Sequence, residues 1–136
     1  MISQSNITVR YAETDQMGIT HHSVYPIWYE VARTEFIKKV GMTYSEMEKL
    51  GILLPLVNLN CHYSGATYYE DELIVEASIK TLTPIKIEFS YQVYRKGEEK
   101  PVNAGSTLHA WVDKNMKIIN LKKHHPDIYH LVEGAL

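Results

Sequence analysis

The sequence has one cysteine, Cys61, in 136 residues, so no disulfide within the chain can stabilise its fold. No apolar run approaches the roughly 20 residues that span a bilayer, because a charge or a glycine interrupts each one. The first residues, Met1–Asn6, are polar and lack the charged and apolar regions of a signal peptide. These absences predict a soluble, cytoplasmic protein without a membrane-spanning segment.

A large excess of one charge is also lacking, since 14 Lys+Arg stand against 16 Asp+Glu. This balance argues against the broad basic surface that binds nucleic acid or anionic lipid. Internal repeats, low-complexity tracts and linkers rich in serine, glycine and proline are absent as well. With 45% hydrophobic residues the chain can form a real core. We therefore expect a single domain, residues 1–136, that binds neither nucleic acid nor membrane.

The N-terminal third of the chain predicts a short strand followed by a long helix. Apolar and polar residues alternate over Ile7–Tyr11, and a turn-rich segment, Glu13–Gly18, follows. From about His22 to Val40 the composition favours a helix, with Pro26 in its first turn and Gly41 at its C-terminal cap. The first half of this helix is apolar on several sides, so we expect it to be largely surrounded.

The rest of the chain predicts a shorter helix, four strands and a short terminal helix. The shorter helix begins with Thr43 and Glu46 at capping-box spacing and ends near Gly51, and the terminal one covers about Pro126–Val132. Alternation with a period of two gives the strands these apolar faces: Val57, Leu59, Cys61 and Tyr63; Leu73, Val75, Ala77 and Ile79; Ile85, Ile87, Phe89, Tyr91 and Val93; Val102, Ala104, Ser106, Leu108, Ala110 and Val112. This order predicts an α+β fold with an antiparallel sheet of about five strands and helices on one face.

The most specific pattern lies between Arg10 and Arg33. It reads R-Y-A-E-T-D-Q-M-G-I-T-H-H-S-V-Y, and E-V-A-R follows at Glu30–Arg33. This pattern resembles the 4-hydroxybenzoyl-CoA thioesterase family, whose members have R-Y, T-D-x-x-G and E-x-A-R in the same order. The stretch Tyr69–Leu73 and the order of strands fit as well, so the resemblance covers most of the chain. It implies the hotdog fold, a sheet wrapped around a long central helix, and hydrolysis of an acyl-CoA to the free acid and coenzyme A.

Asp15 is the catalytic carboxylate that the resemblance implies. It would attack the thioester carbonyl as a nucleophile or activate a water as a general base, and the sequence leaves both routes open. Negative charge then develops on the carbonyl oxygen, and a helix N-terminus offers N–H donors to receive it. The backbone N–H of His22, seven residues after Asp15, matches the family's oxyanion donor. Its imidazole is either a general acid or base, or a side chain that caps or packs.

Four further residues of this segment are candidates with more than one interpretation. Gly18 is expected to let the loop turn tightly beside the substrate, although an ordinary turn also uses glycine. Tyr25 lines the acyl pocket, hydrogen-bonds the loop, or is a core aromatic residue. Glu30 and Arg33 stand three residues apart on the helix, where a structural ion pair is expected, and Glu30 is the alternative catalytic acid.

No metal or cofactor is expected, and coenzyme A enters only as part of the substrate. The histidines occur without an H-E-x-x-H pattern or a cysteine pair, so a metal site is not indicated. Residues that bind the coenzyme's phosphates cannot be singled out among the scattered cations. Members of the resembled family pair their sheets edge to edge, which implies a homodimer or homotetramer.

Two other functions are compatible with this fold. A hydroxyacyl-thioester dehydratase would use an acid on the central helix together with a histidine, so the position of Glu30 relative to the cleft tests it. A binding module would hold an acyl-CoA or an acyl carrier protein without turnover. The intact Asp15 argues against that module, because an acid beside a helix terminus would have no chemical purpose there.

Overall fold

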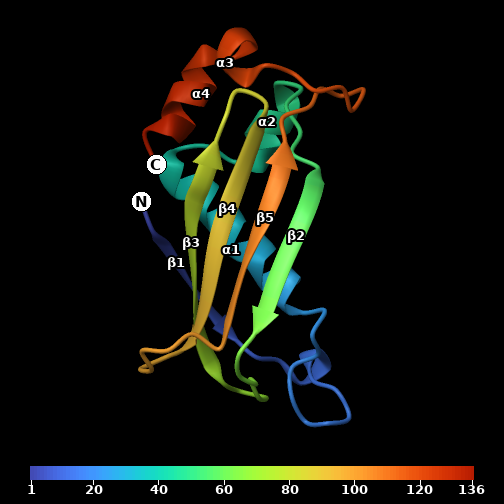
Figure 1. Ribbon diagram of the computed structural model, residues 1–136, viewed down its shortest axis with the longest axis vertical. Coiled ribbons are helices and arrows are strands. Elements are labelled where there is room, and N and C mark those ends of the chain that lie inside the picture. The colour runs from blue at the N-terminus through green and yellow to red at the C-terminus, as the bar shows by residue number, and fades with distance from the viewer.

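The five strands form one antiparallel sheet in a computed structural model that describes all 136 residues, Met1–Leu136. Their order is β1-β3-β4-β5-β2, so β1 and β2 are the two edges of the sheet (Figure 1). The strands are β1 (Ser3–Thr8), β2 (Leu56–Tyr63), β3 (Glu72–Leu82), β4 (Lys86–Arg95) and β5 (Asn103–Ala110). The helices are the short 3-10 turn η1 (Tyr11–Glu13), α1 (Tyr25–Val40), α2 (Tyr44–Lys49), α3 (Leu121–His124) and α4 (Pro126–Glu133). The expected α+β class and number of strands are confirmed.

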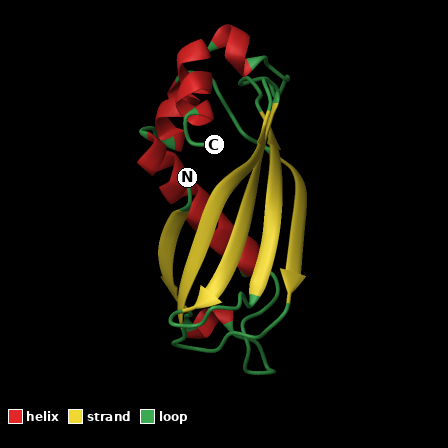
Figure 2. Ribbon diagram, turned by 60° about the vertical axis from the view of Figure 1, so that its left-hand side comes forward, coloured by secondary structure: helices red, strands yellow, loops and turns green.

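The sheet curves around α1, which crosses its concave face (Figure 2). The sheet packs on α1 because its central strands have an apolar inner face. Leu73, Val75 and Ala77 on β3 and the alternating apolar residues of β4 are all buried there. The predicted capping box of α2 begins as expected, since the Thr43 hydroxyl accepts a hydrogen bond from the Glu46 N–H at 3.1 Å. None of the helices is long and apolar enough to cross a bilayer.

The predicted parity of β5 is wrong. Its residues Asn103, Thr107 and His109 are buried on the face that meets α1, in register with Val93, Phe89 and Ile87 of β4. The expected apolar face, with Ala104, Ser106 and Leu108, points to the other side of the sheet. Small outward residues alternate with polar inward ones here, so hydrophobicity alone selects the wrong face. As a result the concave surface near β2 carries hydrogen-bonding groups.

The predicted start of the long helix is also corrected. The helix begins at Tyr25 rather than at about His22, because His21–Val24 form a turn in which the Val24 N–H donates to the His21 carbonyl at 3.0 Å. The first strand lies earlier than expected as well. It ends at Thr8, where its pairing with β3 stops, and Tyr11 falls in η1.

One face of α1 lacks a covering layer, contrary to the expectation of a surrounded helix. Tyr25, Trp28, Tyr29, Ala32, Phe36 and Ile37 are buried. Ile27 and Val31, one turn apart, are 54% and 40% exposed. Leu56, Val57, Leu59 and Tyr63 of the neighbouring edge strand β2 are exposed as well. Together these residues form an apolar surface that continues from α1 onto the edge of the sheet.

Candidate active site

The loop that carries Asp15 is closed at its base by an antiparallel bridge between Thr14 and Thr20. Inside it, the Asp15 N–H donates to the Ile19 carbonyl and the Gly18 N–H donates to the Asp15 carbonyl, both at 2.9 Å. Gly18 has a φ of 80°, the left-handed conformation that glycine adopts without a Cβ clash. The predicted tight turn at Gly18 is therefore present. Figure 1 shows this loop at the same end of the sheet as the β2–β3 connection and the β4–β5 turn.

The Asp15 carboxylate has one engaged oxygen and one free oxygen. Its Oδ1 accepts a hydrogen bond from the Met17 N–H at 2.8 Å, the geometry of an Asx turn. Its Oδ2 accepts no hydrogen bond from the chain, and the residue is partly exposed. The turn thus accounts for the hydrogen bond of Oδ1, and Oδ2 is free to react.

His22 lies just before α1 in the turn that precedes the helix. Its backbone N–H donates no hydrogen bond within the chain, whereas the neighbouring Val24 N–H does. The Tyr63 hydroxyl, at the end of β2, donates to the His22 carbonyl at 2.7 Å and holds this peptide in place. The His22 imidazole is exposed and lies against the His21 ring, with 4.1 Å between ring centroids. The free N–H is a donor of the kind that an oxyanion requires.

Two buried clamps fix the ends of the loop. Glu13 is buried, and its carboxylate accepts from the Arg10 N–H at 2.8 Å and from Trp28 Nε1 at 3.1 Å. Thr67, in the β2–β3 connection, accepts the Thr20 N–H on its carbonyl at 2.8 Å. No pattern in the sequence indicated a role for Glu13 or Thr67. A glutamate directly before the T-D pair was visible, but nothing local indicated that it would be buried.

Tyr25 is buried at the base of the same assembly. Its hydroxyl lies 3.0 Å from the Thr67 hydroxyl, and its ring packs edge-on against Trp28 and Tyr63. Burial raises the pKa of this hydroxyl, an effect that exceeds the opposing one of the hydrogen bond to Thr67. Of the roles considered for Tyr25, the core position is observed, whereas its hydroxyl bonds Thr67 in the β2–β3 connection and not the loop that carries Asp15. Contact with substrate stays a prediction.

Glu30 and Arg33 do not form the expected ion pair. No carboxylate oxygen lies within 4.0 Å of the Arg33 guanidinium. Instead Arg33 donates to the Tyr91 hydroxyl at 3.2 Å, and the Glu30 side chain is exposed. Both line a groove of about 270 Å³ between α1 and β2, which also has Pro26, Ile27, Leu56, Leu59, Thr107 and His109 in its walls.

A directional chain of hydrogen bonds lies beneath this groove. His109 Nδ1 lies 3.1 Å from the Leu54 carbonyl, which only accepts, so this nitrogen carries the proton. Nε2 must then accept from the Thr107 hydroxyl at 2.9 Å, and Thr107 in turn accepts from the Tyr91 hydroxyl at 2.7 Å. Arg33, which only donates, closes the chain at Tyr91. Both nitrogens of His109 are therefore occupied in its neutral form.

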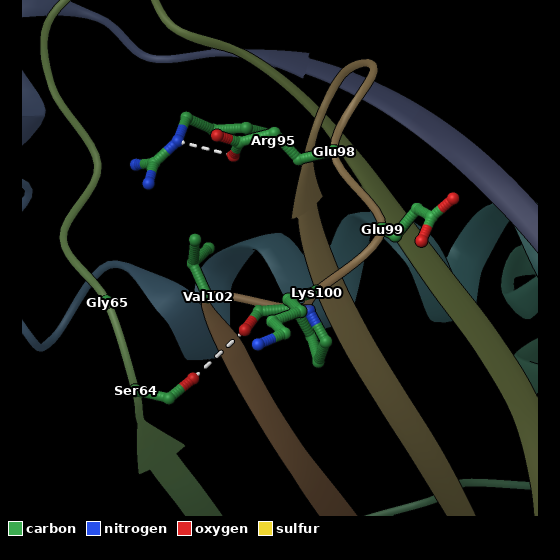
Figure 3. A pocket seen from close by; sticks show the side chains of 8 residues that line it. Ser64, Gly65, Arg95, Glu98, Glu99, Lys100 and Val102 are labelled. Atoms are coloured by element: carbon green, nitrogen blue, oxygen red, sulfur yellow. Dashed lines mark hydrogen bonds and ion pairs between the residues drawn. The ribbon is translucent and has the colours of Figure 1, made fainter.

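A larger surface hollow, about 560 Å³, lies elsewhere. It is bordered by Ser64 and Gly65 after β2 and by the β4–β5 turn (Figure 3). Arg95 is engaged there with Glu98 at 2.7 Å, and Ser64 donates to the Pro101 carbonyl at 3.0 Å. Two cations and two carboxylates line it with a single hydrophobic residue. Such an open and charge-balanced surface lacks the apolar walls and convergent polar groups of a typical ligand pocket.

Similarity to known proteins extends over nearly the whole chain. Residues 9–127 match the family model described as the thioesterase-like superfamily. A putative acyl-CoA thioesterase of Bacillus subtilis (strain 168), YneP, is 40% identical over 135 residues, 98% of this chain and 97% of that protein. The structure of a DHNA-CoA thioesterase from Staphylococcus aureus is 31% identical with a TM-score of 0.92, and the match covers 98% of this chain and 89% of that one.

A structure of 4-hydroxybenzoyl CoA thioesterase shares the fold with a TM-score of 0.84 at 18% identity, covering 96% of this chain and 98% of that one. The resemblance seen in the T-D-x-x-G and E-x-A-R segments is thus confirmed, as is the wrapped-helix architecture. The chain belongs to the thioesterase-like superfamily and is a thioester hydrolase of the hotdog fold.

Proposed function

We propose that the protein hydrolyses an acyl-CoA thioester to the free acid and coenzyme A. The observation that carries this proposal is a pair of free groups: Asp15 has a carboxylate oxygen without a hydrogen bond, and His22, seven residues farther along the chain, has a free backbone N–H. YneP and the S. aureus enzyme, named as acyl-CoA and DHNA-CoA thioesterases, support the substrate class. In this reaction the thioester carbonyl is the electrophile, and the acyl carbon–sulfur bond breaks.

Asp15 acts by one of two routes in this proposal. As a nucleophile its carboxylate adds to the carbonyl carbon, coenzyme A leaves as the thiolate, and water hydrolyses the resulting anhydride. As a general base it takes a proton from water, which adds directly. In both routes the His22 N–H stabilises the oxyanion, and Gly18 lets the loop approach the substrate. A thiol of pKa about 8.5 leaves without a strong acid catalyst, so a single carboxylate suffices.

The test is steady-state hydrolysis of acyl-CoAs, from acetyl to palmitoyl plus benzoyl and phenylacetyl, by the unmodified protein and Asp15→Asn. We expect Asp15→Asn to lose at least about two orders of magnitude in kcat while staying folded. Asp113→Asn is a matched control, because Asp113 Oδ1 accepts an N–H from the residue two positions on at 2.8 Å, as Asp15 does. Equal rates for Asp15→Asn and the unmodified protein would exclude the carboxylate mechanism, and Glu30→Gln would be tested next.

Isotope labelling separates the two routes. In a single turnover in ¹⁸O-enriched water with enzyme in excess, a nucleophilic Asp15 gives an unlabelled acid and a labelled Asp15 when water opens the anhydride at the Asp15 carbonyl, a result that general-base catalysis cannot give. A general-base Asp15 instead gives a labelled product in the first turnover. Mass spectrometry of the product and of the Asp15 peptide distinguishes these results.

One observation supports the dehydratase alternative and another argues against it. Glu30 lines the groove, as that reaction requires of an acid on the central helix. His109 borders the same groove, yet Leu54 and Thr107 occupy both of its ring nitrogens. Without a free imidazole beside Glu30, the proton transfers of a dehydration lack their second group. Hydrolysis is therefore the better-supported reaction.

We propose that the working form is a homodimer at least, with β2 of two copies side by side. β2 is an edge strand with unpaired backbone groups, and the apolar surface formed by Ile27, Val31, Leu56, Val57, Leu59 and Tyr63 adjoins it. Light scattering after size exclusion tests this, and Val57→Lys should shift the protein toward monomers. The lone thiol of Cys61 suits a reducing compartment, which supports a cytoplasmic location.

A further inference from the structure

The end of the sheet that carries Asp15 has little free positive charge. Carboxylates outnumber cations in the three segments that meet there, residues 10–22, 64–71 and 95–101. Arg10 and Arg95 each contact a carboxylate, at 3.4 and 2.7 Å, and Lys96 lies 3.8 Å from Glu72. Coenzyme A carries a pyrophosphate and a 3′-phosphate, which proteins bind through free cations and N–H donors. These phosphates therefore find few partners beside Asp15 of the same chain.

A hollow of about 490 Å³ with unused polar groups lies at the opposite end of the sheet. Its lining includes Lys114, Asn115, His124, His125, Leu50 and Ile119. The four polar side chains make no hydrogen bond within the chain, and Lys114 has no carboxylate within 4.0 Å. Asp113 also borders the hollow, but its Oδ1 accepts two backbone N–H groups of its own turn, at 2.8 and 3.1 Å. The hollow thus offers phosphates a free cation and N–H donors, and it offers an adenine ring an apolar wall.

This hollow lies beside the start of β2. The turn Lys114–Lys117 borders it and is closed by a bridge between Val112 and Ile118. Val112 also pairs with Leu53, shortly before β2, through hydrogen bonds of 2.9 and 3.0 Å. Figure 1 shows this turn and the Asp15 loop at opposite ends of the sheet, both projecting past β2. Within one chain they are separated by about the length of β2, whose eight residues span about 25 Å.

The symmetry of a β2 pair determines where the hollow of a second copy lies. If the two-fold axis is perpendicular to the sheet, the two β2 strands run antiparallel and both α1 helices lie on the same face. If the axis runs along the strands, they pair in parallel and the helices lie on opposite faces. The exposed apolar surface includes Ile27 and Val31 of α1, so only the antiparallel pair buries it in both copies.

The antiparallel pair places the start of one β2 beside the end of the other. At that end the Tyr63 hydroxyl holds the His22 carbonyl, close to the loop that carries Asp15. The hollow of each copy therefore adjoins the candidate active site of its partner. The exposed side chains of Met116 and Ile118, on the turn that borders the hollow, extend the apolar surface toward that site.

We propose that the hollow of one copy binds the nucleotide of the acyl-CoA that the other copy hydrolyses, and that Lys114 contacts its phosphates. This inference rests on the proposed thioesterase function and on the proposed pairing through β2. The pantetheine arm separates the thioester from the phosphates, so the two ends of one substrate reach different copies. One chain supplies Asp15 and His22, and its partner supplies the cation that the first chain lacks.

Binding of coenzyme A, the product, tests the site without turnover. Calorimetry would compare the unmodified protein with Lys114→Glu, which should bind coenzyme A at least about tenfold more weakly. Lys122→Glu is the matched control, because Lys122 is an exposed lysine of the adjacent α3 that does not line the hollow. Urea midpoints show that both variants stay folded. Equal affinities of the two variants for coenzyme A would overturn the site.

Mixed dimers test whether the second copy supplies the hollow. Asp15→Asn and Lys114→Glu chains would be coexpressed with different tags and purified on both. The Lys114→Glu chain keeps its Asp15 and receives an intact hollow from its partner, so one site of each dimer is complete. The KM for an acyl-CoA should return to that of the unmodified protein, with kcat per dimer at about half. A KM that stays as high as in Lys114→Glu homodimers would overturn the proposal.

Thioesters of pantetheine separate this inference from the proposed function. An acyl-pantetheine has the same thioester and no phosphates, so Lys114→Glu should leave its kcat/KM unchanged while kcat/KM for the acyl-CoA falls at least about tenfold. If the unmodified protein cleaves both substrates equally well, thioesterase function stands and the nucleotide site fails. If Lys114→Glu loses affinity for coenzyme A but the unmodified protein cleaves no thioester, the site stands and the proposed hydrolysis fails.

Discussion

The Glu13 carboxylate and the Trp28 indole are hydrogen-bonded at 3.1 Å, which ties the segment before Asp15 to the first turn of α1. The same carboxylate accepts the Arg10 N–H, and the Glu13 carbonyl accepts the His21 N–H at 2.9 Å. Glu13 thus contacts the chain on both sides of the loop that carries Asp15 and His22. The relative position of these two residues depends on it.

Glu13→Gln should weaken this connection while keeping the size of the side chain. One acceptor oxygen becomes an NH₂ group, so Trp28 or the Arg10 N–H loses its partner in a buried place, at a cost of about 1–3 kcal/mol in the free energy of unfolding. We expect kcat to fall as well, because the loop becomes mobile. Urea unfolding and steady-state kinetics measure the two effects. Glu35→Gln, which removes only an exposed contact with Lys38, should change neither.

Tyr63→Phe should affect catalysis more than stability. The hydroxyl donates to the His22 carbonyl from a partly exposed position, so its loss should cost no more than about 1 kcal/mol in unfolding free energy. The freed peptide would present its N–H less rigidly to an oxyanion, and kcat should fall several-fold with little change in KM. Tyr68→Phe is the control, since the exposed Tyr68 hydroxyl makes no hydrogen bond. Identical kcat values for both variants would contradict a role for Tyr63 in holding His22.

The sequence predicted those parts of the fold in which hydrophobicity and burial agree. On β4, Ile87, Phe89, Tyr91 and Val93 alternate with polar residues and all four are buried. The cap of α2 depends on neighbouring residues only, and it was predicted as well. On β5 the two properties disagree, because Asn103, Thr107 and His109 are inside, where Tyr29, Tyr91 and Leu54 on other parts of the chain satisfy them. Such partners are distant in sequence and leave no local signal.

The candidate site also contains some residues that local sequence patterns predicted and others that depend on partners distant in sequence. The T-D-x-x-G segment placed Asp15 and Gly18 in a tight loop, and the structure contains that loop. The clamps Glu13 and Thr67 act through Trp28 and Thr20, which are 15 and 47 residues away from them. The absence of a carboxylate partner at Arg33 could not be predicted from the sequence either, because its spacing from Glu30 predicted an ion pair. Only the fold shows that the two side chains separate along a groove.

Gly105→Ala should destabilise the protein by about 1–3 kcal/mol or more. A Cβ at this position would lie 2.6 Å from the Tyr29 hydroxyl and would also contact the Asn60 carbonyl of β2, and a backbone atom in a paired strand cannot move away cheaply. Gly97→Ala in the β4–β5 turn is the matched control, where a Cβ meets no atom and only the φ of 86° opposes it. Urea midpoints that rank Gly97→Ala as the more harmful change would contradict the close packing of β2, β5 and α1.

His109 makes the stability of the fold depend on pH. Burial lowers the pKa of His109 from 6.5 to about 4, and the nearby charge of Arg33 lowers it as well, against the hydrogen bond to Leu54 that raises it. The unfolded chain therefore binds a proton at this residue below about pH 6.5, whereas the folded chain stays neutral until about pH 4. Protonation would also reverse the hydrogen bond that Nε2 accepts from Thr107.

The contribution of His109 to stability should be complete above about pH 6.5 and should be lost as the pH falls toward 4, with a total of about 3 kcal/mol. Urea unfolding at intervals between pH 4 and 7.5 measures this slope. His109→Gln should be less stable at neutral pH and should lose most of the slope, because the titrating group is gone. Replacing the exposed His124 by glutamine should leave the slope intact. If the slope is the same in His109→Gln and in the unmodified protein, groups other than His109 are responsible for the pH dependence. The hydrogen bonds that link Arg33 to Leu54 would then not depend on a neutral His109 imidazole.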